Sequence, residues 1–226
     1  MRTVQRTALR TSVGVLLLLA TSAPSAHAQV DFGLFAGPTI AHMSGSYVES
    51  SIDTWGLVGA AFAEWHFSEH FSLEGAFGIS QKGAFEVETP LHDEAYDYRF
   101  SYLEIPIAFN YRNAFFGDTW GYRIFAGGAA AFATGCDVKP SSQFSFDTEC
   151  STDTPGGELA GNDFLIQFGF GVDRLFKGGS GFGFDARYSI GTTNLLSEAE
   201  DNGLTAKNRV LDLRFRLFLP LSGPRE

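Results

Sequence analysis

The sequence is poor in cysteine, in basic residues and in long apolar runs, and each shortage excludes a class of protein. Its two cysteines, with five scattered histidines, do not supply the spacing of a Cys/His metal site. Sixteen lysines and arginines stand against 26 acidic residues, and the net charge of −10 argues against nucleic acid as a partner. No glycine-rich phosphate loop precedes a helical pattern. Together with the lack of a Cys/His metal site, this means that the sequence predicts neither a cofactor nor a bound metal.

The only long apolar run lies near the start of the chain. Arg2, Arg6 and Arg10 precede the block VGVLLLLA (13–20), and a small-x-small site follows at 26–28. The block is too short for a membrane-spanning helix, which needs about 20 residues. We therefore predict a secretory signal peptide at 1–28, cleaved after Ala28, and one mature domain at 29–226. The alternative is an N-terminal anchor helix.

Removal of the signal leaves an acidic, exported domain. Three basic and no acidic residues are lost, so the mature net charge is about −13. The two cysteines, Cys136 and Cys150, then form an even pair in an oxidising compartment, which favours one disulfide. Such a bridge would close a loop of about 15 residues. The alternative is two free surface thiols.

Apolar residues recur at every second position in eight stretches, which is the period of a β-strand. In FSYLEIPIAFNY (100–111), Leu103, Ile105 and Ile107 share one face, while Glu104 and Pro106 share the other. We expect Pro106 to mark a local bulge. The other seven apolar faces, like this one, carry no charge, and they lie within 32–40, 57–65, 71–79, 120–132, 164–172, 182–190 and 211–219.

The opposite faces of the same stretches hold six acidic and six basic residues. They are Glu64, Glu74, Glu104, Asp173, Asp185 and Asp212 with Lys82, Arg112, Arg123, Arg187, Arg214 and Arg216. Buried charges persist when they are paired, so we predict a network of ion pairs in an enclosed interior. Within it, we expect Glu104 to pair with Arg123 on the adjoining strand.

Three features favour a membrane barrel over a soluble β-protein. Short links (68–70, 113–119, 177–180) alternate with long ones (44–53, 84–98, 135–161, 195–207), as in outer-membrane barrels. Strands of about 10–13 residues are long enough to cross a bilayer when tilted. Aromatic residues flank the short turns: Trp65, Phe67, Phe71, Tyr111 and Trp120. We therefore predict an all-β fold, an eight-stranded antiparallel transmembrane up-and-down β-barrel in the outer membrane.

Several stretches also resemble a family. YLEIPIAFNY (102–111), FSEHFSLEGAFGISQKG (67–83) and GFGFDARYSIGTTNL (181–195) are similar to strands of the porin-family, PorT-like outer-membrane β-barrel proteins of Bacteroidetes and related bacteria. The resemblance extends over essentially the whole mature chain. It implies a barrel fold and a location in the outer membrane, but no specific activity.

The sequence favours a structural or surface-interaction role over catalysis. We expect contacts with outer-membrane lipid, an unidentified protein or ligand at the long acidic loops, and a monomer. One alternative is a lipid-modifying enzyme, for which His66, Ser72 and the inward glutamates Glu64 and Glu74 are the candidate residues. Another is a narrow porin. The acidic stretch 197–203 could hold Ca²⁺, although a solvated acidic loop is the simpler interpretation.

Overall fold

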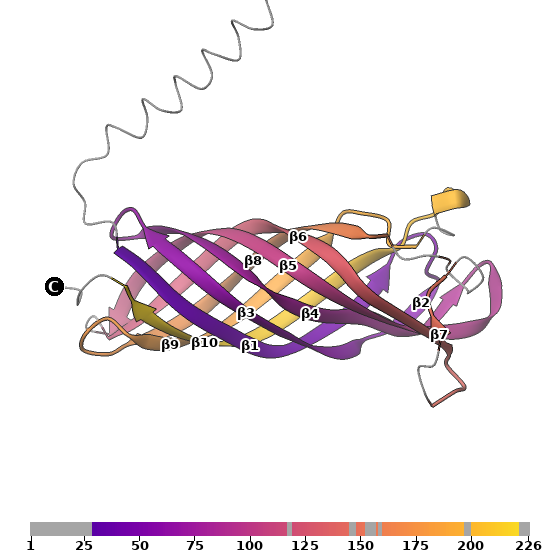
Figure 1. Cartoon of the computed structure of the whole chain (residues 1–226), viewed down its shortest axis with the longest axis horizontal. Helices are drawn as coiled ribbons and strands as arrows, with labels where there is room; N and C mark the ends of the chain where they lie inside the picture. Colours follow the sequence, from indigo (N-terminus) through magenta and orange to yellow (C-terminus); the bar gives the residue numbers. More distant parts are fainter. Residues whose placement is uncertain are drawn as a thin grey trace, which may run out of the picture.

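Eight long strands close on themselves to form a barrel (Figure 1). The computed structural model describes residues 29–116, 119–144, 148–151, 157, 160–196 and 200–221, so the predicted signal peptide lies outside the described residues. The barrel strands are β1 (Gln29–Ser44), β3 (Thr54–His66), β4 (Phe71–Thr89), β5 (His92–Phe116), β6 (Trp120–Pro140), β8 (Asn162–Leu175), β9 (Gly181–Gly191) and β10 (Lys207–Pro220). Two short strands, β2 (Ser50–Ile52) and β7 (Thr148–Glu149), pair with β4 and β6.

The ring follows the order of the chain. Each barrel strand is antiparallel to the next, and β1 closes the ring on β10 from Asp31–Pro220 to Ser44–Lys207. Among the described strands, closure leaves no unpaired edge along the wall, which is what a sheet in hydrocarbon requires. The prediction of an all-β, eight-stranded antiparallel up-and-down barrel is confirmed.

The outer wall is apolar. Leu34, Leu57, Phe170 and Phe184 each expose 59% or more of their surface, and large apolar residues occupy outward positions on all eight barrel strands. An apolar belt of this extent is unfavourable in water and favourable in a bilayer. Among the described residues, no helix is long and apolar enough to cross a membrane.

The two ends of the barrel differ. Short connections lie at one end, on the left in Figure 1, together with the start of β1 and the end of β10. At that end the Leu221 N–H donates to the Val30 carbonyl (2.8 Å). The opposite end carries β2, β7 and the longer connections (Figure 1). In outer-membrane barrels the short turns face the periplasm, so the longer connections face outward from the cell.

The prediction of a long loop at 84–98 is wrong. β4 continues to Thr89 and β5 begins at His92, so these strands run 19 and 25 residues and meet in a tight turn. Register shifts at Val87 and a positive φ of 47° at Glu86 mark an irregular hairpin. The hairpin contains acidic residues, which are rare in strands. They are tolerated because inward side chains such as Val87 and Tyr98, both fully buried, stabilise the hairpin.

The prediction of a bulge at Pro106 is also wrong. Pro106 pairs with Ala129 of β6, and the register there is continuous; the nearby shift lies between Ser101 and Tyr102. On the other side the β4–β5 pairing passes from Gly75–Ile107 to Gly78–Glu104 without a shift. Pro106 has no N–H to donate. The β4–β5 ladder accommodates this by leaving the positions between these two pairs unpaired, and no residue is inserted.

An apolar core fills the extracellular half of the interior, which the sequence analysis did not predict. Tyr98, Phe100 and Tyr102 point inward from the extension of β5 and are fully buried. Side chains from the connecting segments complete the core, because Tyr47, Leu195 and Leu196 are at most 1% exposed. Other members are Met43, Ala84, Val87, Ala129, Ala131, Val138, Leu165 and Ala206. We call this cluster the apolar plug.

Candidate functional site

All twelve charged residues predicted for the interior lie in the lumen. Eleven of them are at most 5% exposed, and the side chain of Arg112, nearest the periplasmic end, is 11% exposed. The ion pairs between them form two groups with equal numbers of acids and bases. Balance within each group matters because an unpaired charge in so enclosed a space would be costly.

The larger group contains four acids and four arginines and lies toward the periplasmic end. Arg216 joins Glu74 (2.6 Å), Glu64 (3.3 Å) and Asp185 (3.4 Å). Arg123 joins Asp185 (2.5 Å) and Glu74 (3.3 Å). The other contacts are Arg123 with Glu64 (3.7 Å), Arg214 with Asp185 (3.0 Å) and Arg112 with both Glu64 and Asp173 (3.3 Å each). Each carboxylate except that of Asp173 therefore meets at least two arginines.

Buried phenylalanines separate these arginines. The guanidinium of Arg216 lies 4.0 Å from the ring centroid of Phe62, and that of Arg214 lies 4.5 Å from Phe35. Arg123 and Arg214 both lie 5.4 Å from Phe125. Cations are attracted to aromatic faces, most strongly away from water. Sequence reasoning missed these rings, although their positions alternate with the outward apolar residues and so place them inside.

The smaller group contains Lys82, Glu104, Arg187 and Asp212. Glu104 pairs with Lys82, accepts a hydrogen bond from Ser80 Oγ (2.7 Å) and lies 3.7 Å from Arg187. Arg187 Nη2 lies 2.6 Å from Asp212. This group lies closer to the apolar plug, since the ring of Tyr102 is 4.8 Å from the Lys82 ammonium.

The predicted pairing of Glu104 with Arg123 is wrong. Glu104 is opposite Ala131 on β6, and Arg123 is opposite Arg112. Eight residues along a strand span about 26 Å, so the two side chains are far beyond contact. The alternation placed both residues on the inner face correctly, but it carries no information about their relative positions along the barrel axis.

A further buried carboxylate lies beside the apolar plug. Asp163 is fully buried and accepts hydrogen bonds from Asn208 Nδ2 (3.2 Å) and the Thr193 backbone N–H (3.3 Å). The same Asn208 amide approaches the hydroxyl of Tyr102 (3.5 Å). The period-2 pattern could have identified Asp163, because it alternates with the outward Phe164.

The candidate hydrolase residues do not form a catalytic triad. Ser72 Oγ donates to Glu64 Oε1 (2.6 Å), but Glu64 is held by arginines. His66 Nε2 instead contacts Asp31 Oδ2 (3.0 Å). A serine hydrolase needs the imidazole on the serine hydroxyl, which this arrangement does not provide. Within the described part of the chain, no cluster of three or more His, Cys, Asp or Glu residues could hold a metal ion.

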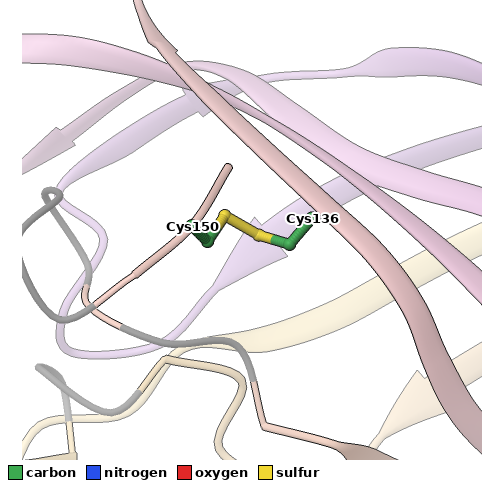
Figure 2. Close-up of a disulfide and its surroundings, with 2 residues drawn as sticks. All are labelled: Cys136 and Cys150. Carbon is green, nitrogen blue, oxygen red and sulfur yellow. A yellow bond between two sulfur atoms is a disulfide. The ribbon is translucent and has the colours of Figure 1, made fainter. Parts of the chain in front are cut away.

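The predicted disulfide between Cys136 and Cys150 is present (Figure 2). It links β6 to the segment after β7 with a Cα–Cα distance of 5.4 Å, and the Cys150 N–H donates to the Cys136 carbonyl (3.1 Å). The bridge therefore fastens the β6–β7 hairpin to itself.

Asp97 fastens the same region to the β4–β5 hairpin. Its carboxylate pairs with Lys139 (2.6 Å) and accepts hydrogen bonds from Ser141 Oγ (2.7 Å) and the Glu86 N–H (2.8 Å). Burial alone would raise the pKa of Asp97, but these contacts outweigh it and the pKa is lowered. Asp97 thus joins β4, β5 and β6 beyond the apolar belt.

A family model described as "Outer membrane protein beta-barrel domain" matches residues 21–197. No curated protein matches the chain. Among solved structures, OprG from Pseudomonas aeruginosa is 10% identical, with 85% of this chain and 97% of that chain covered and a TM-score of 0.47. Neisserial surface protein A is 12% identical (82% and 96% covered, TM-score 0.45). Ail of Yersinia pestis, in complex with the heparin analogue sucrose octasulfate, is 13% identical (83% and 99% covered, TM-score 0.40).

Proposed function

Because the chain belongs to the outer membrane protein β-barrel domain family, we propose that it is a closed, non-enzymatic barrel with a structural or surface-interaction role. Its place in the outer membrane agrees with the prediction from sequence. The narrower resemblance to PorT-like proteins remains a prediction.

The filled lumen is the observation that carries this proposal. Toward the periplasm, the charged groups neutralise one another, and Arg123 and Arg216 are at most 1% exposed. Toward the cell exterior, the apolar plug replaces the charges with Tyr47, Phe100 and Leu195, all fully buried. A solute would have to displace ion pairs in one half and side chains of the connecting segments in the other. Eight strands enclose only enough space for such side chains.

Two alternatives receive less support. A narrow porin needs a continuous polar path, and the apolar plug interrupts the polar interior. A lipid-modifying enzyme needs a nucleophile with its base, but Ser72 and His66 contact different carboxylates. Both candidate residues also lie near the periplasmic end, away from the long extracellular connections.

The extracellular hairpins are the part of the molecule available to a partner at the cell surface. The disulfide and the Asp97 contacts hold the β6–β7 hairpin in place, and its turn presents the fully exposed side chain of Phe144. Exposed acidic residues lie on the connections at this end, such as Glu94 on the β4–β5 hairpin and Asp201 between β9 and β10. These features support an interaction role for an unidentified protein or surface ligand, and they argue against nucleic acid. We expect the protein to be a monomer.

Electrical recording tests the closed barrel directly. Folded protein is reconstituted into planar bilayers at neutral pH, and a known porin in the same membranes serves as the control for insertion. We expect no steady unitary conductance from this protein. Stable open-channel currents of uniform size would contradict the proposal and favour the porin alternative.

A further inference from the structure

The lipid-facing wall contains a groove with a volume of about 570 Å³, which lies across β1, β10, β9 and β8. Small outward residues, Ala36, Pro38 and Ala186, form its floor. Three phenylalanines border it: Phe170 (62% exposed), Phe184 (59%) and Phe215 (41%). The rings of Phe184 and Phe215 lie 5.1 Å apart and form one side. The volume is within the range of binding sites for small molecules.

The backbone, and not a chance arrangement of rotamers, creates this groove. β1 and β10 pair at Ala36–Phe215 and again at Thr39–Asp212, and the two positions between them are Gly37 and Pro38. Pro38 has no N–H to donate to the ladder. A Cβ on Gly37 would lie 1.8 Å from the Leu213 carbonyl oxygen, so only glycine is accommodated there. The floor is therefore recessed relative to the phenylalanines around it, and the recess is built into the strands.

The chemistry of the groove indicates its occupant. The two charged residues that contribute to its lining, Asp185 and Arg214, are engaged with each other at 3.0 Å and belong to the lumen network. The remaining surface is apolar and lies in the belt that already faces membrane lipid. A recess in this belt suits a hydrocarbon chain. The wall of a second barrel is convex and would not fill it.

We propose that this groove binds one acyl chain of an outer-membrane lipid, more tightly than lipid is held elsewhere on the belt. The aromatic border contacts the acyl chain along its length. The floor lets this acyl chain lie deeper in the wall than the neighbouring lipid chains. Dispersion contacts on both sides of the chain supply the preference. The site is specific for the hydrocarbon chain, because no free polar group in the lining addresses a headgroup.

Photocrosslinking tests the proposal in vesicles that contain a small fraction of phospholipid with a diazirine in its acyl chain. Adducts are mapped by mass spectrometry, and folding is checked by the heat-dependent mobility of the barrel on gels. We expect an adduct yield on peptides containing 36–38 and 184–186 about ten-fold above that on the outer face of β4 and β5.

Two filling variants and one control complete the experiment. Ala186→Phe and Ala36→Phe each fill the floor and should reduce the local adducts to the level of the rest of the belt. Ala61→Phe, at an exposed outward position of β3 that does not line the groove, should leave them unchanged. Because the variants act independently, failure of one to fold leaves the other informative.

Two results would overturn the proposal. One is a wild-type adduct pattern that is spread evenly around the belt, or a localised adduct pattern that neither filling variant changes. The other is a wild-type dimer, seen by chemical crosslinking in the same vesicles, that Ala186→Phe or Ala36→Phe converts to monomer. That result would assign the groove to a second copy of the chain.

Discussion

Glu104 pairs with Lys82 of the adjoining strand β4, while Arg123 pairs with Glu74 and Asp185. Strand neighbours alone do not predict this choice, because Glu104 is opposite Gly78 and Lys82 is opposite Phe100. The flexible four-carbon stem of Lys82 covers this offset along the wall. In a closed lumen, a charged group pairs with whichever opposite charge can reach the same level along the barrel axis.

Removal of one partner should therefore be costly. Glu104→Ala leaves Lys82 buried without its carboxylate, and we expect a loss of about 3–5 kcal/mol in the free energy of unfolding. The double variant Lys82→Ala/Glu104→Ala should recover part of this loss. Urea unfolding in vesicles, followed by tryptophan fluorescence, measures both. Arg123→Ala/Glu104→Ala is the matched control, and recovery there instead would contradict the pairing.

Charge on the outer wall should also be penalised. Ile107→Arg or Phe168→Arg places a cation in the apolar belt, and we expect a cost of about 2–4 kcal/mol near the bilayer midplane. Both wild-type side chains are outward and about half exposed, so neither substitution disturbs the lumen. Ser142→Arg in the exposed β6–β7 turn is the control and should cost much less. Equal unfolding free energies for all three variants would mean that the assigned outer face is wrong.

The disulfide should act mainly on its own hairpin. On the chain-entropy model, a closed loop of this size contributes about 3 kcal/mol. We expect Cys136→Ala/Cys150→Ala to keep the barrel folded but to speed protease cleavage within the hairpin. Thiol labelling of the denatured, unreduced wild-type protein should find no free cysteine. Labelling at both positions would rule out the bridge.

Acid should weaken the junction between the two extracellular hairpins. The pKa of Asp97 is lowered on folding, so its contribution to stability is present above its unfolded pKa of about 4 and is lost as the pH falls through the folded value. The difference in unfolding free energy between wild type and Asp97→Asn should therefore shrink below about pH 4. Asp201→Asn, at an exposed site, controls for the general effect of acid. A difference that stays constant from neutral pH to pH 2, or widens, would refute the assignment.

The mature chain should begin at Gln29. Amino-terminal sequencing of the protein from outer-membrane fractions checks this directly, and an intact amino terminus would favour the anchor-helix alternative. The prediction depends on the small residues Ala26 and Ala28 on either side of His27. Substitution of Ala28 by a bulky residue should slow processing, whereas the same change at Gln29 should have less effect.

The sequence by itself determined the fold and the two faces of each strand. Strand side chains alternate with a period of two, so a run such as 102–111 assigns Leu103 and Ile107 to lipid and Glu104 to the lumen without knowledge of any neighbour. Eight such runs, with predicted link lengths that alternate, were enough to predict a closed barrel, even though the link predicted at 84–98 is a tight turn. The two cysteines in an exported chain were enough to predict the bridge.

Only the tertiary structure decided which charges meet and where the interior changes character. Ion-pair partners depend on strand stagger around the ring, which set Glu104 beside Lys82 and far from Arg123. The apolar plug combines Tyr98 and Phe100 of β5 with Tyr47 and Leu195 of distant connections. The groove likewise joins Pro38 of β1 to Ala186 of β9. Such long-range juxtapositions come from barrel closure, which no local period in the sequence encodes.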